Sequence, residues 1–208
     1  MQIDINKLTP MMKQYLEVKN RYKDCILFFR LGDFYEMFFE DALVASKALE
    51  IALTGKACGL EERAPMCGVP FHSANSYISK LVENGYKVAI GEQMEDPSTA
   101  KGIVRREVIR VITPGTVLDG NLLENKKNNY LLSLYKDGTN IGLTYVDIST
   151  GETNATCLNE DKVIEEIAKI HPTEIIINDL DFIEKLRDIA TVSNIYINES
   201  FSDNYLDI

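Results

Sequence analysis

Residues 30–38 read Arg30-Leu31-Gly32-Asp33-Phe34-Tyr35-Glu36-Met37-Phe38, and the predicted elements on either side depend on this stretch. The apolar run 25–29 before it predicts a short buried strand. Gly32 and Asp33 interrupt that run, and Asp33 and Glu36 have the spacing of a helix capping box. We therefore predict a strand over 25–31 and a helix over 34–52. The apolar face of this helix, at a 4-3-4-3 spacing, consists of Phe38, Ala42, Ala45, Leu49 and Ala52.

Phe34 and Glu36 fall on the first turn of this predicted helix, and the sequence allows two interpretations of them. Phe34 precedes Phe38 by four residues, so its ring can join the buried face, and Glu36 can serve only as the capping acceptor. Alternatively, the two side chains point in different directions from an exposed tip, where an aromatic ring and a carboxylate enter a binding partner. The residue pattern alone favours the first interpretation.

Three sequence blocks resemble the MutS family of DNA mismatch-recognition ATPases. The first is Gly-Asp-Phe-Tyr-Glu-Met-Phe at 32–38, which is similar to the family's Gly-Asp-Phe-Tyr-Glu signature. The second is Pro-Met-Cys-Gly-Val-Pro-Phe-His at 65–72. The third is Glu-Gln-Met-Glu-Asp-Pro at 92–97, which runs on to Thr-Pro-Gly-Thr at 113–116. The blocks occur in the family's order within residues 1–116, so the resemblance is specific.

The resemblance implies a role for each residue of the tip. Phe34 would enter the minor groove of DNA beside a mispaired base, and Glu36 would hydrogen-bond the displaced base. The 65–72 block would lie near the DNA backbone, although on pattern alone it is equally well explained as a tight connection between core elements. The candidate backbone contacts in this block are Met66, Pro70 and His72. The implied partners are mismatched duplex DNA, a second subunit of a dimer, and a MutL-type repair protein bound through the second domain.

The nucleotide-binding part of the family is not found in this sequence. The phosphate-binding loop GxxxxGK[ST] does not occur in the 208 residues. We therefore expect the chain to be an N-terminal fragment that has no enzyme activity and no cofactor of its own. The resemblance places ATP and Mg in the remainder of the parent protein.

The charge of the chain is divided unevenly. Residues 1–116 contain 15 Lys and Arg against 15 Asp and Glu, whereas residues 117–208 contain 7 against 17 and carry the whole net charge of −10. Phosphate neutralisation supplies most non-specific DNA affinity, so this chain alone should bind DNA weakly. The candidate phosphate contacts are Lys101, Arg105, Arg106 and Arg110. Strand alternation puts Arg105 opposite Arg106 and Arg110, and the cluster is equally well explained as a solvated edge.

The composition is that of a globular protein without a membrane span. No apolar run reaches the roughly 18 residues of a transmembrane helix, and the N-terminus has no apolar signal core. We therefore expect a cytoplasmic, nucleoid-associated bacterial protein. The cysteines lack CxxC or zinc spacing, so we expect free thiols and no metal site. They are Cys25, Cys58, Cys67 and Cys157.

The predicted elements indicate an α/β fold in two domains. A mixed α+β recognition domain is predicted over 1–116, a polar linker over 117–129, and a second domain over 130–208. Besides the central strand and helix, the first domain should contain helices from Pro10 and at 74–84, strands at 86–92 and 103–112, and loops at 54–63 and 65–70.

The second domain has a recognisable order of predicted elements. They are strands at 130–136, 140–148 and 151–158, a helix at 160–170, a strand at 174–178, a helix at 180–190 and a strand at 192–197. Three antiparallel strands followed by alternating helix and strand resemble the opening of a ribonuclease-H-like fold, as in the MutS connector domain. We expect the domain to be incomplete in this chain.

Two other functional classes remain open. A ribonuclease-H-like half is compatible with a nuclease, for which Asp147 is the candidate metal ligand. Two-metal chemistry needs several carboxylates, however, and no companions for Asp147 lie on the predicted core strands, so we interpret it as structural. The acidic second half is compatible with an interaction scaffold that binds no DNA. Within the family, paralogues that act on recombination intermediates lack the Phe-x-Glu pair that is present at 34–36.

Overall fold

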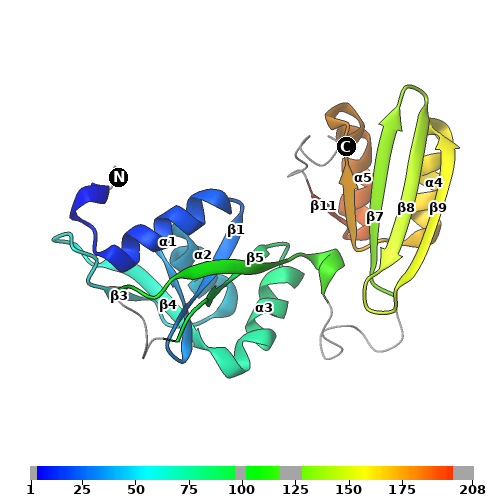
Figure 1. The fold of residues 1–208 in the computed structure, drawn as a ribbon. Helices are drawn as coiled ribbons and strands as arrows, with labels where there is room; N and C mark the ends of the chain where they lie inside the picture. Colours follow the sequence, from blue (N-terminus) through cyan, green and yellow to red (C-terminus); the bar gives the residue numbers. More distant parts are fainter. Residues whose placement is uncertain (1–3, 97–101, 118–127, 199–208) are drawn as a thin grey trace. The chain divides into compact units, whose positions relative to one another are not determined.

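The structure is a computed structural model that describes residues 4–96, 102–117 and 128–198. The chain divides into two compact units, Met1–Ile112 and Thr113–Ile208 (Figure 1). Each unit contains a mixed sheet and helices, which confirms the predicted α/β class. Most of the predicted linker, 118–127, lies outside the described residues.

The first unit is built on a sheet whose described strands run in the order β3-β4-β2-β1-β5-β6. The strands are β1 Cys25–Leu31, β2 Phe34–Phe38, β3 Thr54–Lys56, β4 Ala64–Pro70, β5 Lys87–Gln93 and β6 Arg106–Ile112. The helices are α1 Pro10–Arg21, α2 Phe39–Leu49 and α3 Ala74–Glu83, and short 3-10 turns lie at Ile5–Lys7 and Phe71–Ser73. β1 and β5 pair in parallel, and the other neighbouring strands are antiparallel.

Helices cover both faces of this sheet (Figure 1). α1 packs through Met12 and Tyr15 on the face that carries Leu27 and Phe29. α2 and α3 contact each other and cover the opposite face. Every residue from Cys25 to Phe29 is buried, as expected for a central strand that is covered on both sides. The predicted buried strand is confirmed.

The predicted helix over 34–52 is wrong at its start, because 34–38 form β2 and α2 begins only at Phe39. Gly32 and Asp33 are the two loop residues of a hairpin in which Leu31 pairs with Phe34. Gly32 has φ +59°, a conformation that glycine adopts without steric cost. Gly-Asp between apolar runs is itself a hairpin signal, and it competed with the capping-box spacing. The aromatic residues that follow, Phe34 and Tyr35, then favour a strand.

Two predicted loops also contain strands. Residues 54–56 of the predicted loop 54–63 form β3, and the predicted turn-rich segment 65–70 lies in β4. β4 pairs with β2 on one side and with β3 on the other. Its prolines lie at the last position and next to the first, where a missing N–H disturbs the ladder least. The prediction that this segment is not helical is confirmed.

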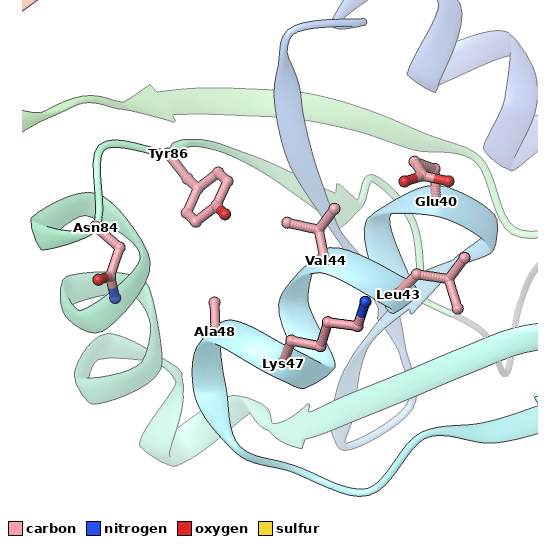
Figure 2. Close-up of a pocket in the computed structure, with 7 residues that line it drawn as sticks. All are labelled: Glu40, Leu43, Val44, Lys47, Ala48, Asn84 and Tyr86. Carbon is pink, nitrogen blue, oxygen red and sulfur yellow. The ribbon is translucent and has the colours of Figure 1, made fainter.

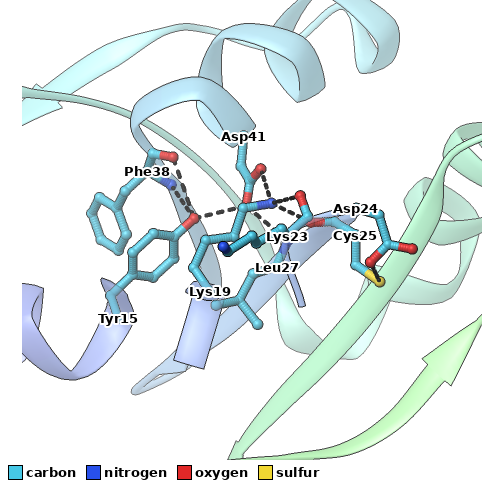
Figure 3. Close-up of polar contacts among 8 residues, drawn as sticks. All are labelled: Tyr15, Lys19, Lys23, Asp24, Cys25, Leu27, Phe38 and Asp41. Atoms are coloured by element: carbon cyan, nitrogen blue, oxygen red, sulfur yellow. Dashed lines mark hydrogen bonds and ion pairs between the residues drawn. The ribbon is translucent and has the colours of Figure 1, made fainter. Parts of the chain in front are cut away.

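A buried polar network holds the point where β2 leaves the sheet and α2 begins (Figure 3). The Tyr15 hydroxyl donates to Asp41 Oδ2 at 2.9 Å, and the same oxygen accepts the Leu27 N–H at 3.0 Å. Lys19 Nζ lies 2.7 Å from Asp41 Oδ1 and also donates to the Cys25 carbonyl. At Cys25 and Leu27, β1 pairs with β5 but not with β2, so these side chains bond backbone groups that β2 does not reach.

The second unit contains a sheet whose described strands run in the order β11-β10-β7-β8-β9. The strands are β7 Tyr130–Asp137, β8 Asn140–Asp147, β9 Glu152–Asn159, β10 Glu174–Ile177 and β11 Tyr196–Asn198, and the helices are α4 Glu160–Ile170 and α5 Leu180–Ser193. β7, β8 and β9 are antiparallel, and β10 pairs in parallel with β7 and β11. The predicted order of elements is confirmed. The last strand begins later than predicted because α5 extends to Ser193.

Asp147 has the structural role that the sequence indicated. Its Oδ1 accepts hydrogen bonds from the Ser149 N–H at 2.9 Å and the Ser149 hydroxyl at 2.6 Å. Its Oδ2 accepts the Asn129 N–H at 3.1 Å, and the residue is only 2% exposed. Both oxygens are therefore occupied in tying the turn after β8 to the start of β7.

The Thr-Pro-Gly-Thr block at 113–116 is docked within the second unit by Glu174 of β10. Glu174 Oε2 accepts the Thr113 hydroxyl at 2.5 Å and the Gly115 N–H at 2.9 Å. A Cβ added at Gly115 would lie 2.8 Å from Glu174 Cβ, closer than packing allows. Glycine is therefore needed in this block for close approach to a buried carboxylate.

Candidate nucleic-acid interface

The β1–β2 hairpin ends in an exposed tip formed by Gly32, Asp33 and Phe34. The Asp33 carbonyl accepts the Phe71 N–H at 2.9 Å, which attaches the turn to the segment after β4. The tip therefore has a fixed backbone while its side chains face solvent.

Phe34 is the exposed aromatic residue of β2. Its side chain is 46% exposed, whereas Phe38 at the other end of the strand is 0% exposed. Phe34 pairs with Leu31 on one side and with Pro70 on the other. Side chains two apart on a strand leave the same face, so Phe34 and Glu36 point the same way. This corrects the expectation, based on a helical turn, that they point in different directions.

Glu36 lies in a partly buried position opposite Gly68 of β4. A Cβ at Gly68 would lie 3.2 Å from the Tyr35 carbonyl oxygen and 3.4 Å from Glu36 Cγ, so the glycine leaves room for the carboxylate. Lys56 Nζ of β3 lies 2.5 Å from Glu36 Oε2 and 5.6 Å from the ring centroid of Phe38. The carboxylate thus has a lysine counter-charge that was not predicted from the sequence.

The opposite face of the hairpin carries a group of side chains centred on Arg30. Its Nε donates to the Gly32 carbonyl at 2.5 Å, and its guanidinium lies 3.7 Å from the Phe71 ring centroid. Arg30 Nη1 lies 3.7 Å from Glu92 Oε1, which also accepts the Tyr35 hydroxyl. Burial, followed by this hydrogen bond, raises the pKa of Tyr35 to about 12, so the hydroxyl stays a donor at neutral pH. Phe71, 42% exposed, is a second tip aromatic that was not predicted.

The predicted backbone contacts of the 65–72 block differ in their distance from the tip. Pro70 pairs with Phe34, and His72 is exposed in the 3-10 turn that follows. Met66 pairs with Phe38 at the far end of β2 and packs against the core. Pro70 and His72 are therefore the members of this block that the fold places beside the tip.

The prediction that Arg106 contacts phosphate is contradicted by its burial. The residue is only 7% exposed. Its Nε donates to the Arg30 carbonyl at 2.6 Å, and its Nη1 donates to Gln14 Oε1 at 3.0 Å. Burial lowers the pKa of the Arg106 guanidinium. Its N–H groups donate hydrogen bonds within the protein interior, and these bonds connect β6 to β1 and α1.

The other predicted phosphate contacts differ from Arg106. Arg105 and Arg110 are both exposed. Strand alternation predicts that Arg106 and Arg110 share a face, but the β5–β6 pairing changes register midway, and Arg110 is exposed where Arg106 is buried. Lys101 lies outside the described residues.

The family model described as MutS domain I matches residues 9–121, and the model described as MutS domain II matches residues 129–205. The chain belongs to the MutS family. Three similar relatives are each named DNA mismatch repair protein MutS. The Acetivibrio thermocellus relative is 66% identical over 175 residues, covering 82% of this chain and 20% of that protein. The Alkaliphilus oremlandii relative is 61% identical over 191 residues, covering 90% and 21%. The Clostridium tetani relative is 52% identical over 204 residues, covering 96% and 23%. The chain therefore spans about a fifth of the length of these MutS proteins.

A groove on the same unit of this MutS chain does not involve the tip. It has a volume of about 530 Å³ and lies along α2, with apolar lining from Leu43, Val44, Ala48 and Tyr86 (Figure 2). None of the residues that line it belongs to the β1–β2 hairpin. The stretch 32–38 that resembles the MutS signature thus lies in the β1–β2 hairpin, with Phe34 at its exposed end, and not in this groove.

Within residues 4–96, 102–117 and 128–198, no group of three or more His, Cys, Asp or Glu side chains is arranged to hold a metal ion. In the same ranges, no helix is long and apolar enough to cross a membrane. The cysteines are free thiols, as predicted. Burial raises the pKa of Cys25 to about 12 and that of Cys67 to about 11.

Proposed function

We propose that the first compact unit, Met1–Ile112, is the domain with which a full-length MutS recognises mismatched or looped base pairs in duplex DNA. One observation carries this proposal: Phe34 is exposed at the end of a braced hairpin, on a strand whose other apolar residues are buried. An exposed aromatic ring costs free energy in water, so its place on a fixed tip suits insertion into a partner.

Phe34 would act as a wedge. Apolar side chains that enter the minor groove separate neighbouring bases and kink the duplex. Unstacking costs a few kcal/mol per step, and less where pairing is already faulty. The difference between faulty and intact pairing then gives selectivity without any reading of base sequence.

Glu36 would add a hydrogen bond to the displaced base. It leaves the same face of β2 as Phe34, so a ring inserted at a mispair brings the carboxylate to that base. A carboxylate accepts hydrogen bonds only, so it is favourable only where a base presents a donor. An intact duplex, whose donors are already paired, would be disfavoured.

Of the predicted contacts to the DNA backbone, we propose those whose side chains are exposed beside the tip or elsewhere on the surface. Pro70 and His72 would lie along the backbone next to the inserted ring, and Arg105 and Arg110 would neutralise phosphates. Lys101 stays a prediction because it lies outside the described residues. Arg106 and Met66, whose side chains serve the core, are not retained.

The rest of the proposed function belongs to the parent protein. ATP and Mg would bind outside these 208 residues, and a second subunit would help to enclose the duplex. Residues 130–208 would form a connector domain, which we expect to contact a MutL-type partner. Its acidic charge disfavours phosphate contact and suits a protein partner.

A chimaera provides the test. Residues 1–208 would replace the matching segment of the Acetivibrio thermocellus MutS, and fluorescence anisotropy would compare a duplex with a central G·T mispair against its matched counterpart. We expect tighter binding of the mispair by about tenfold or more, equivalent to about 1.4 kcal/mol. The Phe34→Ala chimaera should bind both duplexes alike. Equal affinities for the two duplexes with Phe34 present would contradict the proposal.

A further inference from the structure

Glu36 is not an isolated carboxylate. Lys56 reaches it from β3 across β4, and the Nζ–Oε2 distance is 2.5 Å. The two side chains are 35% and 16% exposed, so the ion pair is partly shielded from water. Within the described residues, no other cation lies within ion-pair distance of Glu36, and its second oxygen accepts no hydrogen bond.

The sheet explains why this pair can form. Strand order places β4 between β3 and β2, and the β4 residue opposite Glu36 is Gly68. Gly68 places no side chain next to the Glu36 carboxylate, and Lys56, which pairs with Ala64 on the other side of β4, reaches that carboxylate diagonally. The Lys56 ammonium also lies 5.6 Å from the ring centroid of Phe38, a distance at which an aromatic face attracts a cation. Lys56 is therefore held by two partners on β2.

We propose that Lys56 is a positioning residue for mismatch recognition, which aims and neutralises the Glu36 carboxylate. This proposal rests on the proposed function of Phe34 and Glu36. Lys56 engages Oε2 and leaves Oε1 to accept a hydrogen bond from a base. The pair is neutral as a unit, so it approaches the phosphates without the repulsion that an uncompensated carboxylate would meet. Lys56 thus acts through Glu36 and does not itself contact DNA.

Two other roles for Lys56 make different predictions. If Lys56 bound a phosphate, its loss would weaken matched and mismatched duplexes alike and would reduce the salt slope by about one. If it served only the stability of the fold, its loss would lower the unfolding temperature and leave the ratio of the two affinities unchanged. A positioning role changes that ratio, and only when Glu36 is present.

A double-mutant cycle in the chimaera tests the proposal. The variants are Lys56→Gln, Glu36→Gln and the two combined, each measured on G·T and matched duplexes. We expect Lys56→Gln to reduce the preference for the mispair by about tenfold when Glu36 is present. In the Glu36→Gln variant it should reduce that preference by less than about twofold, because the effects of contacting residues are coupled. Lys56→Arg, which keeps the charge, should restore most of the preference. The control is Lys47→Gln, an exposed lysine on α2, which should change nothing.

The results distinguish failure of the Lys56 proposal from failure of the proposed function. The role of Lys56 would be overturned if Lys56→Gln reduced the preference for the mispair equally with Glu36 present and with Glu36→Gln. It would also be overturned if Lys56→Gln reduced that preference in neither case. The Phe34→Ala chimaera, measured in parallel, tests the proposed function separately. If Phe34→Ala removes the preference while the cycle shows no coupling, only the Lys56 proposal fails. If Phe34→Ala leaves the preference unchanged, the proposed function fails with it. Thermal unfolding of each variant identifies any loss that arises from the fold.

Discussion

The Tyr15 hydroxyl lies 2.9 Å from Oδ2 of Asp41, and this buried contact joins α1 to the first turn of α2. Asp41 is 5% exposed and also pairs with Lys19. The network fixes the end of β2, the strand that carries Phe34 at its other end. The core therefore fixes the strand that carries Phe34.

Removal of Asp41 should destabilise the chain strongly. Asp41→Ala leaves the Lys19 ammonium and the Leu27 N–H without their partner, and breaking a buried pair in this way costs about 3 kcal/mol or more. Tyr15→Phe removes only a hydroxyl and should cost about 1 kcal/mol. Urea unfolding would measure both. The neighbouring exposed Glu40→Ala is the control and should lie within about 0.5 kcal/mol of the parent; a similar value for Asp41→Ala would contradict the role of the network.

Phe34→Ala should leave stability almost unchanged. The ring is 46% exposed, so its removal should change the free energy of unfolding by less than about 1 kcal/mol. Phe38→Ala, at a fully buried position on the same strand, should cost about 3 to 5 kcal/mol. Urea unfolding of the two variants gives the comparison. If Phe34→Ala cost as much as Phe38→Ala, the ring would belong to the core and the wedge would be excluded.

Stability should depend on Asp147 in a pH-dependent way. The hydrogen bond from the Ser149 hydroxyl lowers the Asp147 pKa, assisted by backbone hydrogen bonds and opposed by burial. A lowered folded-state pKa means that the ionised carboxylate stabilises the fold above its unfolded pKa of about 3.9. This contribution disappears as pH falls through the folded-state value.

The measurement is urea unfolding of the parent and Asp147→Asn between neutral and acidic pH. The difference in free energy of unfolding should be constant near neutral pH and should shrink as pH falls below about 4. Asp137→Asn, at an exposed position of β7, is the control. A difference for Asp147→Asn that stays constant down to acidic pH would show that its ionisation is not linked to folding.

The 208-residue chain alone should bind duplex DNA weakly and distinguish mispairs poorly. Residues 1–116 have no net charge, and kinking and unstacking DNA cost several kcal/mol that other contacts must supply. Neutralisation of about three phosphates gives a salt slope of only about −3. We expect dissociation constants no tighter than about micromolar at physiological salt, the non-specific range. Nanomolar binding with strong mismatch preference in a gel shift would show that the tip alone supplies the recognition energy.

Much of the fold follows from local sequence patterns. The strand 25–31, the helix from Pro10 and the elements of the second unit have clear apolar periods and turn residues. They occur where predicted, apart from the late start of the last strand. The failure lies at 32–38, where a capping-box spacing and a Gly-Asp hairpin signal coincide. Pairing of β2 with β1 and β4 favours the hairpin over the helix. The pairing with β4 joins residues that are far apart in the sequence.

The candidate site was predictable in part. Phe34 and Glu36 are identified by the resemblance, but their shared face required β2 to be a strand. Lys56 lies twenty residues from Glu36, and only the order of β3, β4 and β2 brings the two together. Arg106 illustrates the converse error, because a basic residue on a predicted surface strand turned out to be a buried donor. Contacts that depend on strand order and register cannot be read from local sequence.

The insertion of Phe34 at a mispair is the central claim, and site-specific photocrosslinking tests it most directly. The chimaera would carry Phe34→p-benzoylphenylalanine, be irradiated on a duplex with one G·T mispair, and have its adducts mapped by primer extension. The same substitution at Ile109, which is 60% exposed on β6, is the control. We predict adducts from position 34 at the mispair or its neighbouring nucleotide, and few on matched DNA. Adducts spread evenly along the duplex, or equal yields on matched and mismatched DNA, would contradict the account.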